Sequence, residues 1–183
     1  MQRIEQVDPE LATGKTAELL TAVNSQMGII PNILKTMARS PATLGGYLGL
    51  SSGLSGGVLS PQLREQIALA VAGTNGCDYC ASVHSAIGSQ TGLSTDELSR
   101  NLHGRSDDPK TEAALTFAKA IVTKKGFVCD GKLAAIRDAG YSEEEIVEII
   151  GHTAMNIFTN YFNHIAGTEI DFPAVNTREA VSA

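Results

Sequence analysis

The sequence predicts an all-α protein, a single domain over residues 1–183 with about eight or nine helices. Successive apolar segments are separated by short polar breaks that carry glycine, proline or capping residues. No stretch shows the regular alternation of a β-strand. Hydrophobic residues make up 43% of the chain, which is enough for a core. Aromatic residues make up only 5% and tryptophan is absent, so this core must rely on aliphatic side chains and methionine.

Three helices are predicted in the N-terminal third. Residues 1–26 form an N-terminal extension and the first helix, which ends near Gly28. The second begins around Pro31, since proline suits the first helical turn, and ends before Pro41. The third, over residues 40–54, is rich in glycine, which costs a helix stability. It is either a weak helix with loop ends or a helix whose glycines allow close helix contact.

The clearest helix pair lies within residues 60–92. Ser60 can cap the first of the two helices, and Pro61 can occupy its first helical position. Residues 67–73 carry no charge, so this helix should be buried on most sides. Residues 73–76, "GTNG", are a turn signal. The cysteines that follow should therefore lie in the first turn of the next helix.

Three further helices are predicted after this pair. Ser94 and Glu97 form a capping box at the start of one. The next, over residues 108–126, is amphipathic and ends in lysines and a glycine, as helix C-termini prefer. A short helix follows over residues 130–140, beginning at an aspartate and closed by a glycine.

The final helix starts at Ser142, where Glu145 completes a second capping box, and runs to about Ala166. Its apolar residues cover far more than the ~100° stripe that a surface helix needs. The helix is therefore either central to the monomer or shared with another subunit. The tail after Pro173 is expected to be loosely ordered.

The charge of the chain excludes some partners. Its formal net charge is −6, whereas nucleic acids and anionic membrane surfaces attract clustered lysine and arginine. The polar N-terminus resembles no secretory signal, and no stretch approaches the ~18 apolar residues of a membrane span. We therefore expect a cytoplasmic protein, in which a C-x-x-C pair indicates redox or metal chemistry rather than a disulfide scaffold.

Cys77, Cys80 and His84 share one helical face. At about 100° per residue, Cys80 lies about 60° from Cys77, and His84 falls between them. Tyr79 points the other way. Free N–H groups at a helix start favour a thiolate, and a nearby imidazole can accept the thiol proton. The pattern predicts a reactive thiol with a resolving neighbour, and helix-start electrostatics alone would favour Cys77 as the more acidic one.

Glu65 lies twelve residues before Cys77 on the preceding predicted helix. Two helices joined by a tight turn pack antiparallel, so its carboxylate could return to the Cys–His face and relay protons. The alternative is a surface glutamate paired with Arg64 or a nearby lysine.

Other interpretations of the cysteines and histidines remain open. Two cysteines and a histidine are a partial zinc set, but a second ligand pair is lacking, so no metal is expected. Two inert buried thiols are the other alternative. Cys129 is expected to be a small buried residue. We interpret the remaining histidines as structural, with His164 the one to watch because three asparagines lie near it; they are His103, His152 and His164.

The segment "REQIALAVAGTNGCDYCASVHSAIG" resembles the AhpD-like alkylhydroperoxidase branch of the carboxymuconolactone decarboxylase family. The shared pattern is Glu65, eleven residues, C-x-x-C, three residues and His84. The resemblance extends over most of residues 27–173, and the family's C-x-H-C histidine is replaced here by Tyr79. It implies an AhpD-like helical bundle and a homo-oligomer, either trimer or hexamer.

The resemblance also implies a peroxidase without haem, metal or other cofactor. Cys80 would attack hydrogen peroxide or an alkyl hydroperoxide, Cys77 would resolve the product to a disulfide, and His84 and Glu65 would relay protons. An external dithiol, of lipoyl or thioredoxin type, would reduce the pair. The alternatives are an acid–base enzyme like the related decarboxylases, a thiol–disulfide oxidoreductase or redox sensor, and a zinc-stabilised interaction module.

Overall fold

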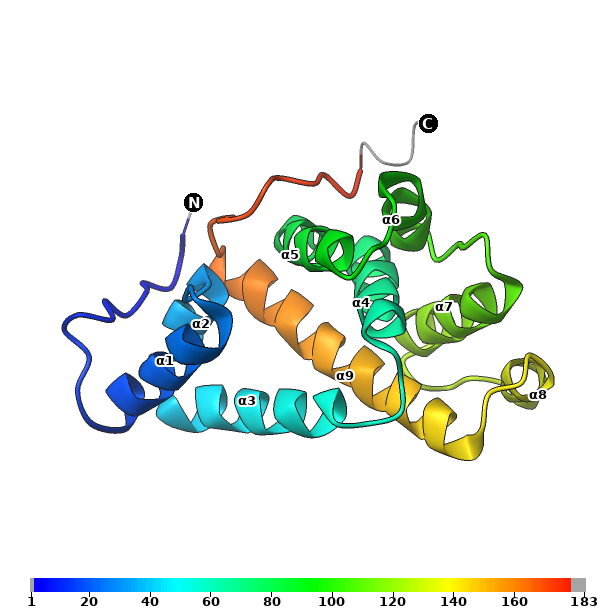
Figure 1. Ribbon diagram of the computed structural model, residues 1–183, viewed down its shortest axis with the longest axis horizontal. Helices are drawn as coiled ribbons and strands as arrows, with labels where there is room; N and C mark the ends of the chain where they lie inside the picture. Colours follow the sequence, from blue (N-terminus) through cyan, green and yellow to red (C-terminus); the bar gives the residue numbers. More distant parts are fainter. Residues whose placement is uncertain (1, 179–183) are drawn as a thin grey trace.

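The computed structural model describes residues 2–178, and all regular elements in that part of the chain are α-helices. This confirms the predicted all-α class (Figure 1). The nine helices are α1 (Gly14–Met27), α2 (Asn32–Met37), α3 (Pro41–Ser55), α4 (Pro61–Asn75), α5 (Asp78–Gln90), α6 (Thr95–Leu102), α7 (Pro109–Thr123), α8 (Asp130–Asp138) and α9 (Glu143–Ala166). No helix among the described residues is both long and apolar enough to cross a bilayer.

The helix α4 lies at the centre and contacts α5, α6, α7 and α9 (Figure 1). Its uncharged stretch is buried, as the sequence predicts. Leu69 and Ala72 pack into a hydrophobic cluster with α1, α2 and α5. Ile67 and Val71 face a second cluster built with α7, α8 and α9. Because α4 buries opposite faces in two clusters, it fixes the positions of both halves of the molecule.

The closing helix α9 crosses the molecule from end to end, drawn in yellow and orange in Figure 1. It begins with the predicted capping box, in which the Ser142 side chain accepts the Glu145 N–H and the Glu145 side chain accepts the Ser142 N–H. Its inward face is buried through residues such as Ile146 and Ile149. Its outward face leaves large apolar side chains exposed: Val147, Ile150, Phe158, Tyr161 and Ile165.

The turn between α4 and α5 is shorter than the sequence predicts. Gly73 belongs to α4, which continues to Asn75, and Gly76 alone makes the turn with φ 68°, in the left-handed region. Gly73 has a different role, because a Cβ there would lie 1.9 Å from the carbonyl oxygen of Leu102. The glycine lets the backbones of α4 and α6 touch.

The capping box predicted for Ser94 and Glu97 is formed only in part. The Ser94 side chain caps α6 by accepting the Glu97 N–H. The Glu97 carboxylate does not return to Ser94, and instead accepts hydrogen bonds from Gln66 and Asn101, both at 2.9 Å. A donor from α4, Gln66, and one from the next turn of α6, Asn101, therefore replace the capping partner.

Two further expectations are wrong. Cys129 is exposed, because it precedes α8 at the surface rather than packing in the core. The second expectation, a loosely ordered tail after Pro173, is wrong for residues 174–178, and residues 179–183 lie outside the part of the chain that the structure describes. Val175 donates its N–H to the Ser82 hydroxyl at 2.9 Å, and Thr177 donates its N–H and hydroxyl to the Asp78 carboxylate at 2.9 and 2.7 Å. Polar groups of α5 thus fix a segment whose composition predicts mobility.

Candidate active site

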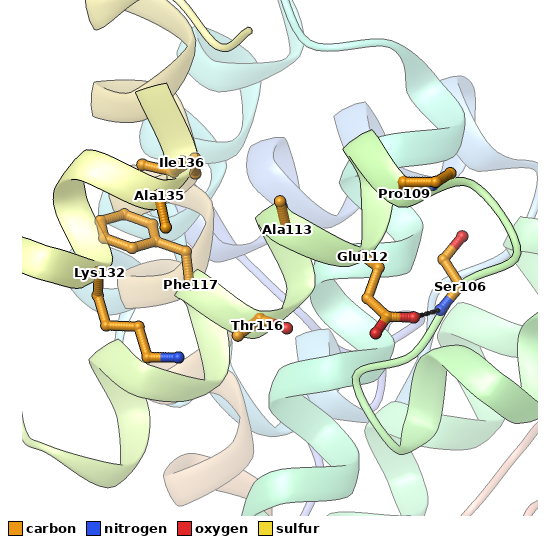
Figure 2. Close-up of a pocket in the computed structure, with 9 residues that line it drawn as sticks. All are labelled: Ser106, Pro109, Glu112, Ala113, Thr116, Phe117, Lys132, Ala135 and Ile136. Atoms are coloured by element: carbon orange, nitrogen blue, oxygen red, sulfur yellow. Dashed lines mark hydrogen bonds between the residues drawn. The ribbon is translucent and has the colours of Figure 1, made fainter. Parts of the chain in front are cut away.

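Two cavities, each of about 410 Å³, lie within the described part of the chain. One lies between α7 and α8 (Figure 2) and holds no cysteine. Its acidic residue is already engaged, since the Glu112 carboxylate accepts the Ser106 N–H and pairs with Arg105 at 3.0 Å. The other cavity is bounded by α1 to α5 and α9, and Cys80, His84 and Glu65 line it.

The two sulfurs lie where α5 begins. The left-handed Gly76 ends α4, and Cys77 is the N-cap residue of α5. The Cys77 sulfur accepts the N–H of Cys80 at 3.4 Å. Both cysteines are free thiols and almost fully buried. The structure therefore brings the two predicted sulfurs together, with Cys80 facing the cavity.

The surroundings make Cys80 the acidic thiol of the pair. A hydrogen bond from the Cys77 thiol, the charge of His84 and a hydrogen bond from Asn163 together overcome burial and lower the pKa of Cys80 to about 6. The hydrogen bond to Cys80 and burial raise the pKa of Cys77. This order of the two pKa values is opposite to the one that helix-start electrostatics alone predicts, because the Cys77 thiol donates its hydrogen bond to the Cys80 sulfur.

Glu65 and His84 meet across α4 and α5. The Nδ1 of His84 lies 2.7 Å from Oε2 of Glu65, and both side chains are largely buried, with 21% and 17% exposed. Burial acts to lower the pKa of His84, but the charge and hydrogen bond of Glu65 outweigh it and raise that pKa. The raised pKa favours the imidazolium form of His84 next to Cys80. This cation can stabilise a Cys80 thiolate and can donate a proton during a reaction.

The structure adds Asn163, whose role the sequence did not predict. Asn163 lies near the C-terminal end of α9, and its Nδ2 donates a hydrogen bond to the Cys80 sulfur at 3.2 Å. One turn earlier, Asn160 accepts a hydrogen bond from Asn75 at 2.9 Å. The sequence did contain a signal for a polar site here, namely the asparagines at positions 156, 160 and 163 on an otherwise apolar helix. The expectation attached it to His164, which is exposed.

Tyr79 is anchored away from the sulfurs by its hydroxyl, although its side chain also lines the cavity. The hydroxyl donates to the Asp171 carboxylate at 2.9 Å and accepts the Ile33 N–H at 3.2 Å. Burial raises the pKa of Tyr79, so the phenol stays neutral. The tyrosine ties α5 to α2 and to the C-terminal segment.

His152 is buried and lines the same cavity as Cys80. Its interpretation as a structural residue stays a prediction. Among the described residues, no cluster of three or more His, Cys, Asp or Glu side chains is arranged to hold a metal ion.

The acidity of Cys80 gives a direct test. We expect the Cys80 thiolate to form with a midpoint near pH 6, and its rate of alkylation to rise with pH up to that point and then level off. The Cys77→Ala variant loses the largest cause of the lowered pKa, so the midpoint should move to higher pH. Ultraviolet absorbance of the thiolate against pH measures both. An unchanged midpoint in Cys77→Ala would contradict the assignment.

Comparisons with known proteins agree with this architecture. The sequence profile of the carboxymuconolactone decarboxylase family matches residues 41–122. No curated protein sequence matches the chain. A peroxidase-related protein with an AhpD core from Ralstonia eutropha JMP134 has 22% sequence identity and a TM-score of 0.84, over 93% of this chain and 92% of that one.

Two other solved structures are similarly close in fold. A peroxidase-related protein from Silicibacter sp. TM1040 has 20% identity and a TM-score of 0.79, over 92% of each chain. A cysteine-to-alanine variant of the debrominase Bmp8, solved with 2,3,4-tribromopyrrole, has 22% identity and a TM-score of 0.80, over 99% of this chain and 96% of that one. At these identities the likeness establishes the fold.

Proposed function

We propose that this chain is a thiol-dependent peroxidase of the carboxymuconolactone decarboxylase family, in its AhpD-like branch, and that it acts through Cys80 and Cys77. The observation that carries the proposal is the lowered pKa of Cys80, whose sulfur lies at a cavity wall beside His84. A thiolate is the form that attacks peroxides. A carboxymuconolactone-type acid–base enzyme would have no use for such a sulfur.

The proposed first step is attack of the Cys80 thiolate on the outer oxygen of a hydroperoxide. The O–O bond breaks, Cys80 becomes a sulfenic acid, and the remaining alkoxide takes a proton to leave as an alcohol, or as water from hydrogen peroxide. His84, whose charge acts on Cys80, can supply this proton. Its ion pair with Glu65, at 2.7 Å, keeps the imidazole protonated and oriented.

In the second step Cys77 attacks the sulfenic sulfur of Cys80. The S–O bond breaks, the hydroxyl leaves as water with the Cys77 proton, and a disulfide forms. The contact between the Cys77 sulfur and the Cys80 N–H supports this step, because it places the two residues one turn apart at a helix start. An external dithiol of lipoyl or thioredoxin type would then reduce the disulfide by exchange.

The proposal is tested by the mass of the intact protein. One equivalent of peroxide should convert the reduced chain to a species lighter by two hydrogens, with Cys77 and Cys80 joined in the peptide map. A Cys129→Ser variant should give the same result, since Cys129 is outside the cavity. Retention of both free thiols would refute the peroxidase. Reduction of a protein disulfide without reaction with peroxide would favour the thiol–disulfide oxidoreductase.

A second candidate has one specific observation in its favour. The debrominase Bmp8 shares the fold over 99% of this chain, and its solved complex holds a halogenated pyrrole. Incubation of the reduced protein with a brominated pyrrole separates the two functions. Release of bromide with no consumption of peroxide would replace the peroxidase with a thiol-dependent dehalogenase.

Self-association is part of the proposal. Along α9, Phe158, Tyr161 and Ile165 are 41%, 53% and 62% exposed, which is unusual for large apolar side chains on one helix face. Covering this face with another copy of the chain would remove it from water. Analytical ultracentrifugation of the wild-type chain should show a trimer or hexamer.

A further inference from the structure

One polar atom in the cavity is unexplained by the proposed reaction. Within residues 2–178, Nε2 of His152 has no hydrogen-bond partner, although the side chain is only 3% exposed. A buried polar atom without a partner is costly, so natural proteins rarely leave one unless something binds there. His152 lines the same cavity as Cys80, which makes a bound molecule the natural partner.

The Arg64 guanidinium, a positive charge without a paired carboxylate, lies near His152. Arg64 lines the cavity, and its Nη1 donates to the Ser55 carbonyl at 2.6 Å. No carboxylate in the described part of the chain lies within ion-pair distance of this guanidinium, which leaves most of its five donors available. Arg64 is close enough for its charge to act on the pKa of His152.

The carboxylates nearby are already occupied. Glu65 pairs with His84 at 2.7 Å. Glu148 accepts the N–H groups of Val58 and Leu59, at 2.9 and 3.1 Å. Burial, and then the charge of Arg64, lower the pKa of His152 below its usual value, while Glu148, a backbone hydrogen bond to Leu54, and Glu65 act in the opposite direction. The wall therefore presents the Arg64 guanidinium and the unpartnered Nε2 of His152, and the Glu65 carboxylate beside them is already bonded to His84.

These groups lie at a distance from the sulfur. Asn163, which contacts Cys80, and His152 are eleven residues apart on α9, which is roughly 16 Å along the helix axis. The cavity is also lined by apolar side chains, including Met27, Ile33, Leu48, Val83 and Ile87. Its volume of about 410 Å³ suits a small organic ligand. A molecule that reaches both ends must be elongated and apolar in the middle.

We infer that the cavity selects hydroperoxides of apolar carboxylic acids, with the carboxylate held by Arg64 and by the imidazolium form of His152, which a bound carboxylate favours, and the hydroperoxide group directed to Cys80. This inference rests on the proposed function for its reactive end. The proposed binding of the carboxylate does not depend on the peroxidase reaction, since it involves only Arg64, His152 and the apolar wall. A carboxylate matches the guanidinium in charge and in its paired acceptors.

The test measures binding without any peroxide. We expect the reduced wild-type chain to bind dodecanoate at least about tenfold more tightly than its methyl ester, which has the same chain and no charge. Arg64→Gln should remove this preference, and Arg64→Lys should keep part of it, because lysine keeps the charge but not the paired donors. His152→Gln, if folded by circular dichroism, should weaken binding of dodecanoate more than that of the ester.

Equal binding of acid and ester by the wild-type chain, or a preference that survives in Arg64→Gln, would overturn the inference. Turnover separates it from the proposed function. With a hydroperoxy fatty acid, Arg64→Gln should raise KM and leave kcat little changed, and this rise in KM should exceed the rise for tert-butyl hydroperoxide, which has no carboxylate. A chain that binds dodecanoate selectively but consumes no hydroperoxide would disprove the peroxidase and leave the carboxylate site standing.

Discussion

Replacement of Cys80 by serine is expected to lower peroxide turnover by more than about 10³-fold, the order of loss seen when a covalent nucleophile is removed. The reason is that serine at this position stays protonated at neutral pH, whereas the Cys80 pKa of about 6 makes the sulfur a thiolate. Steady-state consumption of hydroperoxide with a dithiol donor measures the loss.

Two matched variants show whether the loss is specific. Cys129→Ser changes an exposed thiol and should keep the wild-type rate. Cys77→Ser should still consume one equivalent of peroxide and then stop as a sulfenic acid, because the resolving thiol is gone. Full activity in Cys80→Ser, or loss of activity in Cys129→Ser, would contradict the assignment of the attacking sulfur.

Replacement of Gly73 by alanine is expected to lower the free energy of unfolding by about 3 kcal/mol or more, at the upper end for overpacked sites. The added Cβ would lie 1.9 Å from the carbonyl oxygen of Leu102, and a backbone atom cannot turn aside as a side chain can. For a domain of this size, the thermal midpoint should fall by roughly 10 °C. Thermal and chemical denaturation of the same variant measure both quantities.

The control is another helical glycine. Gly46 lies in α3 with nothing within 4 Å of the position that its Cβ would occupy. Alanine there should stabilise the chain by about 0.5–1 kcal/mol, the usual gain in helix propensity. A neutral or stabilising Gly73→Ala would show that α6 can move away from α4, and would refute the close contact as a requirement of the fold.

Much of the arrangement follows from local patterns. The caps at Ser60 and Ser142 fix where α4 and α9 begin, because a serine oxygen satisfies an N–H group that the helix leaves free. The spacing from Glu65 to Cys77 predicts that two helices fold back on one another, and the 2.7 Å contact between Glu65 and His84 agrees with this. Local spacing was sufficient here because only two residues, Gly76 and Cys77, lie between α4 and α5.

Other features depend on contacts between residues far apart in the chain. Asn163 lies 83 positions after Cys80, yet its amide is bonded to that sulfur. The exposure of Cys129 also depends on tertiary structure, since nothing near it in the sequence says that α8 begins at the surface. The burial of His152 has the same origin, because the packing of α9 against α3 and α4 encloses it.

The amino-acid sequence alone determined the all-helical class, most helix starts, and the set of a glutamate, two thiols and an imidazole on neighbouring helices. These depend on hydrogen bonds and side-chain spacing within a turn or two of one helix, so the order of residues specifies them. The tertiary structure alone decided which thiol is acidic, and that an arginine and an unpartnered histidine share its cavity. Acidity and burial depend on the charges and apolar surface that surround a group, and distant segments supply most of both.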